Sequence, residues 1–200
     1  MAAPAGTATS AIALAQREEL GEMAEIVLGV TGSIAAYKAA ELVRVFIRGG
    51  HGVHVVMTKA ATEFVTPLTF RTLSRNPVAV GMFDEPAGWE PRHVSLASLA
   101  DVLVIAPCTA NVLAKLAHGI ADDELTATAL ACRAPLVVAP AMNNAMFAHP
   151  ATQANLGILR ERGVTIAEPE EGELACGATG QGRLAPVDSI AQAVFTVLGK

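Results

Sequence analysis

Five short apolar runs recur along the chain, and segments with helical spacing separate them. The runs cover residues 25–31, 53–58, 102–107, 136–140 and 164–166. Strands that are apolar along most of their length, rather than at alternate positions, are typical of parallel sheets covered on both faces. Parallel neighbours need a crossover, which the intervening helices supply. The pattern therefore predicts a single three-layer, doubly wound α/β domain of the Rossmann or flavodoxin type, built on a parallel sheet.

The segments between these runs place apolar residues three and four positions apart, as helices do. The helix after the first run should end at Gly49-Gly50, and Pro67 suits the first turn of the next because its missing N–H costs nothing there. The expected helices cover 34–48, 66–74, a stretch through Leu116, and about 123–132, 150–162 and 187–198. We interpret residues 1–24 as a tail, residues 25–200 as the folded domain and residues 81–92 as a mobile loop.

Composition excludes several classes of function. The net charge is −5 and no block of lysine and arginine occurs, which argues against a nucleic-acid binder. No uncharged run is long enough to cross a bilayer, so no membrane partner is expected, and the N-terminus lacks the basic start of a secretory signal, so the expected location is cytoplasmic. Charged residues make up only 16% of the chain, which suggests that apolar surface is buried between subunits.

The three cysteines, Cys108, Cys132 and Cys176, are odd in number and far apart in the sequence. No CxxC pair exists, so neither a disulfide framework nor a metal site follows from them.

Small and hydroxyl-bearing residues follow four of the runs, where the carboxyl ends of parallel strands share one edge of the sheet. Thr31-Gly32-Ser33-Ile34 opens a helix whose free N–H groups can bind an anion, although an ordinary strand-to-helix turn would look the same. The stretch is neither GxGxxG nor GxxxxGK[ST], so it supports no dinucleotide or Walker-type grip. The other three ends are Thr58-Lys59-Ala60, Thr109-Ala110-Asn111 and Ala141-Met142-Asn143. Together they predict a polar mouth on an apolar domain.

Two single residues allow a plain and a functional reading. Asn143 can cap the helix that follows it, or its amide can clamp a carboxylate. His93 can be a loop histidine, or an imidazole that exchanges a proton near neutral pH.

Four motifs together carry a family resemblance. They are Gly-Ser-Ile-Ala-Ala at 32–36, His93 ahead of Leu-Ala-Asp at 99–101, Ala-Pro-Cys-Thr-Ala-Asn at 106–111 and Pro-Ala-Met-Asn-Asn-Ala-Met-Phe at 140–147. With them, the chain resembles the homo-oligomeric flavin-containing cysteine decarboxylases from about Ile26 to Leu198. That family includes enzymes of coenzyme A biosynthesis, which convert phosphopantothenoylcysteine to 4'-phosphopantetheine, and peptidyl-cysteine decarboxylases of peptide maturation.

The resemblance implies FMN as cofactor and a trimer, or a dodecamer of trimers, with the flavin near a subunit boundary. The residues expected to line the flavin are Gly32, Ser33, Ile34, Thr58, Ala60, Thr109, Ala110, Asn111 and Ala141. The expected substrate is a small molecule or peptide that ends in cysteine, oxidised by the flavin to a thioaldehyde before it loses CO₂.

The resemblance also implies roles for individual residues. His93 is the proton-handling residue, and Asn143, with Met142 and Met146, holds the substrate. Cys176, in the glycine-rich stretch 174–184, occupies the position of the proton-donating cysteine of the coenzyme A enzymes, and Arg183 is placed to meet a substrate phosphate.

Two departures from the usual motifs, Cys108-Thr109 and Phe147, keep a peptide-tailoring enzyme open as the alternative. A flavoprotein regulator without catalysis is a third hypothesis.

Overall fold

A five-stranded, wholly parallel sheet forms the centre of the protein in this computed structural model, which describes residues 23–83, 91–173 and 179–199. Its strands are β1 (Glu25–Val30), β2 (Gly52–Met57), β3 (Val102–Cys108), β4 (Leu136–Pro140) and β5 (Thr165–Ile166). They lie in the order β2-β1-β3-β4-β5, which is the strand order of flavodoxin-like doubly wound sheets. The predicted fold class is confirmed.

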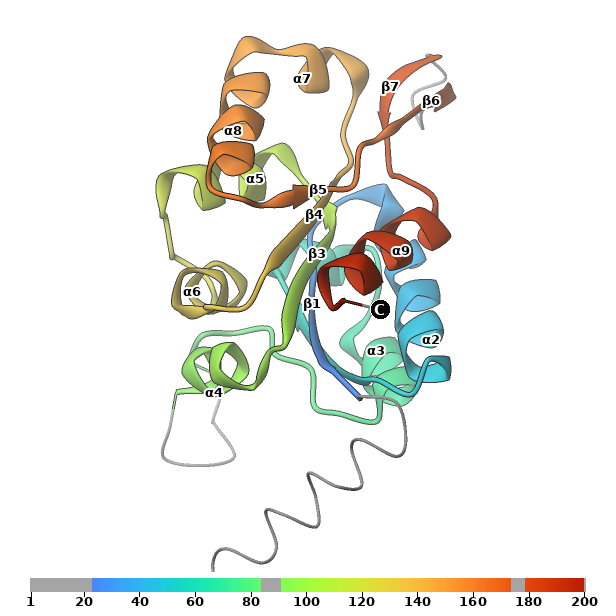
Figure 1. Cartoon of the computed structure of the whole chain (residues 1–200), viewed down its shortest axis with the longest axis vertical. Coiled ribbons are helices and arrows are strands. Elements are labelled where there is room, and N and C mark those ends of the chain that lie inside the picture. Colours follow the sequence, from blue (N-terminus) through green and yellow to red (C-terminus); the bar gives the residue numbers. More distant parts are fainter. Residues whose placement is uncertain (1–22, 84–90, 174–178, 200) are drawn as a thin grey trace, which may run out of the picture.

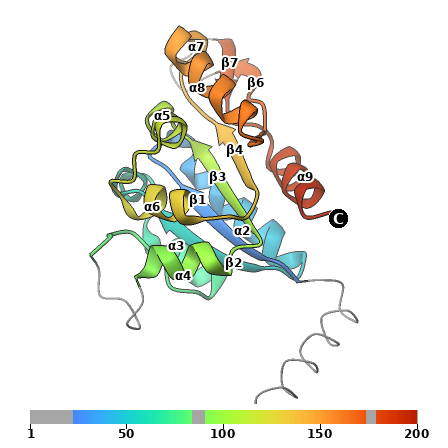
Figure 2. The same cartoon turned by 60° about the vertical axis from the view of Figure 1, so that its left-hand side comes forward.

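Helices cover both faces of the sheet (Figures 1 and 2). One face carries α2 (Lys38–Arg48), α3 (Pro67–Ser74) and α9 (Val187–Val197). The other carries α4 (Arg92–Leu99), α5 (Ala110–His118), α6 (Glu124–Ala131) and α8 (Pro150–Glu161). Three shorter pieces follow strand ends, namely η1 (Ile34–Tyr37), η2 (Lys59–Glu63) and α7 (Asn144–Ala148). Among the described residues, no helix is long and apolar enough to span a membrane.

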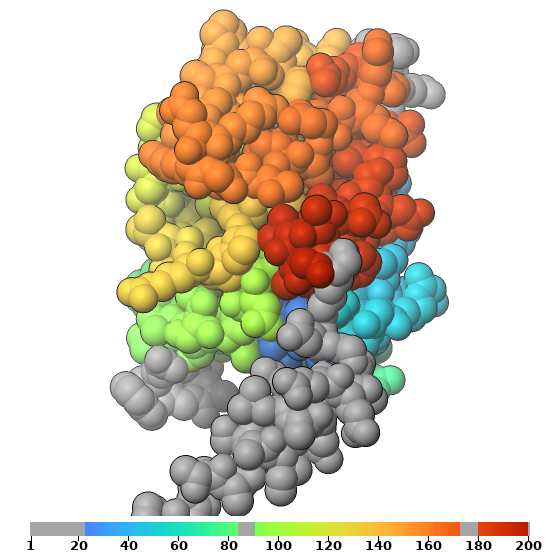
Figure 3. All heavy atoms as spheres, viewed as in Figure 1, coloured from blue at the N-terminus to red at the C-terminus, as the bar shows by residue number. Residues whose placement is uncertain are grey.

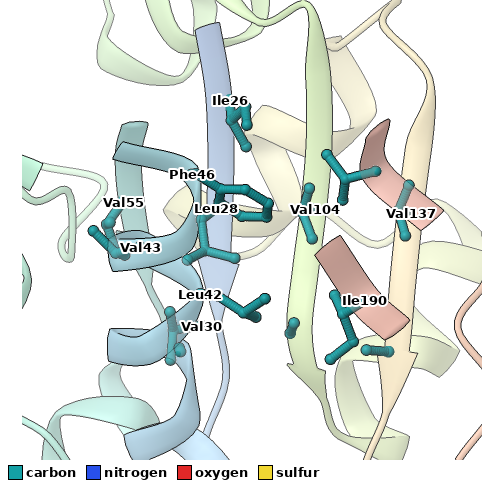
Figure 4. Packing of buried hydrophobic residues seen from close by; sticks show 14 of the residues in the cluster. Ile26, Leu28, Val30, Leu42, Val43, Phe46, Val55, Val104, Val137 and Ile190 are labelled. Atoms are coloured by element: carbon teal, nitrogen blue, oxygen red, sulfur yellow. The ribbon is translucent and has the colours of Figure 1, made fainter. Parts of the chain in front are cut away.

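Alternation along β1 divides the core into two layers. Ile26, Leu28 and Val30 point toward α2, where they meet Leu42 and Phe46 (Figure 4). Val27, which lies between Ile26 and Leu28, packs on the opposite face, in a core layer that also contains residues of α5, α6 and α8. Full burial of each such large apolar side chain stabilises the fold by roughly 1.5–3 kcal/mol. Burial on both faces is the physical reason that these strands read as continuous apolar runs.

A two-stranded antiparallel hairpin stands outside the main sheet. Its strands are β6 (Glu170–Glu173) and β7 (Thr179–Arg183), and it lies beside α7 (Figure 1). The sequence does not predict this hairpin, because its strands are polar and glycine-rich and show no apolar alternation. Its connection, residues 174–178, lies outside the described residues, and Cys176 lies with it.

Helices from both layers are visible on the face of the molecule drawn in Figure 3. On the face in Figure 3, α4 and α6 lie next to each other on one side, and α9 and α2 lie on the other. Helix α4 begins at Arg92, where the loop predicted for residues 81–92 ends. Residues 84–90 of that loop, and residues 1–22 of the predicted tail, are outside the described part of the chain.

Candidate active site

A cavity of about 630 Å³ opens at the carboxyl ends of β1, β3 and β4. Its walls come from the start of the first helical segment, from the turns after β3 and β4, and from the end of β7. The lining residues are Gly32, Ser33, Ile34, Ala35, Tyr37, Lys38, Thr109, Ala110, Ala141, Met142, Asn143, Met146, Gly182, Arg183 and Leu184. The predicted mouth thus exists, at the edge of the sheet where parallel α/β domains bind ligands.

The turns after β1 and β3 are fastened to each other by one buried threonine. The Thr31 hydroxyl donates to the carbonyl oxygen of Pro107 at 2.7 Å and accepts from the Thr109 amide at 3.0 Å. Because both bonds are buried or partly buried, they fix the separation of the two turns. Sequence reasoning placed Thr31 at a strand end but missed this role.

The turn after β1 presents backbone donors to the cavity. Ser33 caps η1, since its Oγ accepts from the Ala35 amide at 3.2 Å. In the described part of the chain, no hydrogen bond is formed by the amides of Gly32 and Ile34. Free amides at the start of a helical segment, here 34–48, favour a bound anion.

Gly32 permits this turn to lie directly on η2. A Cβ added at Gly32 would stand 2.5 Å from the Cβ of Ala60 and 3.0 Å from its carbonyl carbon. Atoms do not approach so closely without a shift of the backbone. The close approach explains a glycine at this position better than conformational freedom does.

The turns after β3 and β4 each combine a helix cap with a place in the wall of the cavity. Thr109 Oγ1 accepts from the Val112 amide at 3.4 Å and caps α5. Asn143 Oδ1 accepts from the Ala145 amide at 2.9 Å and caps α7. The two readings of Asn143 are therefore compatible, because the same residue caps a helix and lines the cavity.

The hairpin supplies the remaining wall through a backbone contact. The Met142 amide donates to the Gly182 carbonyl oxygen at 3.0 Å. Gly182 has φ +135°, and a Cβ there would press on the Met142 carbonyl oxygen, so only glycine suits the position. This contact brings Arg183 to the cavity beside the predicted substrate residues.

Five lining residues were not among the predicted site residues, namely Ala35, Tyr37, Lys38, Gly182 and Leu184. Tyr37 and Lys38 are the two of these with polar side chains. They follow Ile34 by three and four positions, so all three lie on one face of a helical segment, and this spacing could have identified them. Lys38 and Arg183 place positive charge on two different elements of the wall.

Of the nine predicted cofactor residues, six line the cavity, and Thr58, Ala60 and Asn111 do not. Thr58 caps η2 by accepting from the Ala61 amide at 3.3 Å, and Ala60 packs against Gly32. Asn111 is exposed in the first turn of α5. All four predicted substrate residues, Asn143, Met142, Met146 and Arg183, line the cavity.

His93 does not line the cavity of its own chain. It lies in the first turn of α4, where its Nδ1 is 4.0 Å from an oxygen of Glu124 on α6. Figures 1 and 2 both show α4 toward one end of the molecule and α7 with the hairpin toward the other. Within one chain, therefore, the structure does not bring His93 together with Asn143.

The described cysteines are poor nucleophiles. Cys108 is fully buried at the end of β3, and burial raises the pKa of its thiol far above the ordinary range. Desolvation also raises the pKa of the half-buried Cys132. Both thiols stay protonated at neutral pH. Among the described residues, no group of three histidine, cysteine or acidic side chains could hold a metal ion.

Comparison with known families gives a match over nearly the whole chain. Residues 14–199 match the family model described as Flavoprotein.

Two curated relatives are similar in sequence. The coenzyme A biosynthesis bifunctional protein CoaBC of Bacillus subtilis is 47% identical over 165 residues, which are 82% of this chain and 41% of that protein. A probable phosphopantothenoylcysteine decarboxylase of Streptococcus mutans is 44% identical over 172 residues, covering 85% of this chain and 96% of the relative. The chain thus spans about two fifths of the bifunctional relative and nearly all of the shorter one.

Two solved structures are similar in fold and sequence. A PPC decarboxylase mutant complexed with pantothenoylaminoethenethiol has a TM-score of 0.80 and 33% identity, with 90% of this chain and 100% of that chain covered. The FMN-dependent cysteine decarboxylase SpaF has a TM-score of 0.73 and 38% identity, with 88% of this chain and 99% of that chain covered.

Proposed function

The chain belongs to the Flavoprotein family, and on that premise we propose that it is an FMN-dependent decarboxylase that converts phosphopantothenoylcysteine to 4'-phosphopantetheine. The observation that carries the proposal is the cavity at the strand ends, which joins an anion-binding turn at Gly32-Ser33 to the substrate residue Asn143. The relative from Streptococcus mutans, which this chain matches over 96% of its length, is named a probable phosphopantothenoylcysteine decarboxylase.

The residues present fit FMN. The amides of Gly32 and Ile34, with the Ser33 hydroxyl, suit its single phosphate, since the start of a helical segment favours an anion. Ala110 and Ala141 offer a small, apolar surface on which the flat ring can lie. When bound, FMN would supply a two-electron oxidation of the substrate CH₂–SH group, in which carbon loses one hydride to the flavin and sulfur loses one proton, and the resulting thioaldehyde would be the electron sink for loss of CO₂.

The chain's own residues then have separate tasks. The Asn143 amide holds the substrate carboxylate until the bond to it breaks, because an amide group can donate to a carboxylate oxygen. Lys38 and Arg183 line the wall on α2 and β7, where their charges suit the phosphate of the substrate. His93 takes up or returns a proton at the substrate.

The position of His93 supports a homo-oligomeric active site. Since His93 lies outside the cavity of its own chain, we place it at the cavity of a neighbouring subunit in a trimer or a dodecamer of trimers. Exposed apolar side chains near the cavity, among them Ile34, Tyr37 and Met146, are suited to burial at such a boundary.

The first test is a decarboxylation assay on the flavin-loaded protein. Incubated with phosphopantothenoylcysteine, it should give a product lighter by about 44 mass units, the mass of CO₂, because conversion to the saturated thiol involves no net oxidation. Peptides that end in cysteine should turn over slowly or not at all. Mass spectrometry reads both results. A protein that takes up no FMN would overturn the proposal, and a flavin-loaded protein without turnover on any substrate would indicate a regulator.

The second test concerns Cys176, which we propose as the proton donor in the final step. The substitution Cys176→Ser should shift the product from a loss of about 44 to a loss of about 46 mass units, because the enethiol is released before the hydride is returned. Cys132→Ser, at a half-buried thiol away from the cavity, is the matched control and should leave the product unchanged. A saturated product from Cys176→Ser would contradict the role.

The alternative substrate is the C-terminal cysteine of a peptide. The observation that favours it is the likeness to SpaF at 38% identity, because SpaF is named a cysteine decarboxylase and not a decarboxylase of phosphopantothenoylcysteine. Efficient turnover of the peptide, with loss of about 46 mass units and no turnover of phosphopantothenoylcysteine, would establish this reading.

A further inference from the structure

A buried carboxylate stands beside the imidazole of His93. Glu124 is the first residue of α6, and its side chain is 1% exposed. Its Oε2 lies 4.0 Å from Nδ1 of His93, whose side chain is 27% exposed. Nδ1 itself is buried and has no hydrogen-bond partner among the described residues. The exposed part of the ring is therefore its opposite edge.

The burial of Glu124 has a cost that its surroundings offset. An ionised carboxylate loses its hydration when buried and needs favourable charge nearby. The N-terminus of α6 supplies part of that, since helix starts stabilise acidic side chains. The imidazole faces the same carboxylate with its buried Nδ1 at 4.0 Å, and an N–H dipole at that position favours the negative charge where water is excluded.

The other acidic side chains at the start of α6 are already neutralised. Asp122 and Asp123 accept from the Lys115 ammonium at 2.6 and 3.2 Å. Their carboxylates lower the free energy of the lysine cation, and the pKa of Lys115 is raised mainly by its hydrogen bond to Asp122. Arg92 precedes His93 on α4 itself. Across the contact of α4 with α6, Glu124 is thus the acidic group in ion-pair range of the imidazole.

We propose that Glu124 is a positioning residue for His93. Its carboxylate favours a proton on Nδ1, so that Nε2, at the exposed edge of the ring, carries the lone pair that exchanges a proton with the substrate. A base that is oriented by a third group is a general arrangement in proton-transfer sites. The inference rests on the proposed role of His93 in catalysis, but the tautomer can be measured without any turnover.

The test uses ¹⁵N-histidine labelling of the flavin-loaded protein, with the His93 signals assigned by their absence in His93→Asn. The wild type should show a protonated Nδ1 and a bare Nε2. Glu124→Gln should weaken this preference, and Glu124→Leu, which removes both charge and acceptor, should give the Nε2–H form that predominates in free histidine. In the assay, kcat should fall about tenfold to a hundredfold with KM little changed.

Glu25→Gln is the matched control. Glu25 pairs with Nε2 of His54 at 2.9 Å, so this substitution also removes a carboxylate from an imidazole, but on β1 and β2. It should leave the His93 tautomer and kcat unchanged. A purely structural role for Glu124 would lower the unfolding temperature in both Glu124 variants and leave the tautomer as it is, and that result would overturn the proposal. If the proposed function fails, the wild type itself shows no turnover while the tautomer still reports on the pair.

Discussion

Replacing His93 with asparagine should reduce decarboxylation by about a hundredfold to ten-thousandfold, because a positioned acid–base group contributes that much to a rate. Flavin binding should remain, since His93 does not line the cavity of its own chain and its proposed task is proton transfer at the substrate. The measurement is product formation by mass spectrometry beside the flavin absorbance of the same sample. His118→Asn is the control, since that histidine pairs with Asn155 at 3.0 Å in the contact of α5 with α8. Wild-type turnover in His93→Asn would refute its role.

Mixing inactive subunits tests whether the active site is shared. In hybrids of His93→Asn with a variant that cannot bind FMN, some cavities with intact flavin sites receive His93 from the other kind of subunit. A share of the activity should therefore return when the two inactive proteins are unfolded and refolded together. Hybrids that stay inactive would show that His93 acts within its own chain.

Replacing Gly32 with valine should weaken FMN binding. The new Cβ would stand 2.5 Å from the Cβ of Ala60, and the nearby carbonyl carbon prevents the side chain from yielding alone. Overpacking of this kind costs roughly 1–3 kcal/mol and should displace the turn whose amides we propose to bind the FMN phosphate. We expect FMN affinity to fall at least about tenfold to a hundredfold, which titration of the flavin-free protein with FMN measures by fluorescence quenching.

A matched substitution separates this effect from a general loss of stability. Gly157 lies on α8, and a Cβ there meets no atom within 4 Å. Gly157→Ala should therefore keep wild-type FMN affinity. If Gly32→Val is folded by circular dichroism and also binds FMN as the wild type does, the phosphate does not lie at this turn.

The sequence predicts the sheet and its binding edge well, because continuous apolar strands report directly on burial from two sides. The predicted strands at 25–31 and 102–107 overlap β1 and β3 closely, and their small, polar ends line the cavity. Such a pattern depends only on residues that are close together in the sequence, and for this reason it can be recognised without knowledge of the tertiary contacts.

Other parts depend on contacts that no local pattern records. The β6–β7 hairpin is held by backbone pairing and by the bond between Met142 and Gly182, forty residues apart in the sequence. The 4.0 Å approach of Glu124 to His93 likewise joins α6 to α4, and β3 and α5 lie between these two helices in the sequence. The resemblance implied a role for His93, but it did not indicate where on the chain's surface this residue lies.

The backbone bond from the Met142 amide to the Gly182 carbonyl oxygen joins two parts of the site that are held in place in different ways. The turns at Gly32 and Thr109, which we propose to face the flavin, are fastened to each other by Thr31, whereas the hairpin joins the cavity from outside the sheet. Side chains along the hairpin can therefore change during evolution without disturbing the turns that receive the cofactor. Related proteins can therefore retain the same flavin site while they differ in substrate and in product.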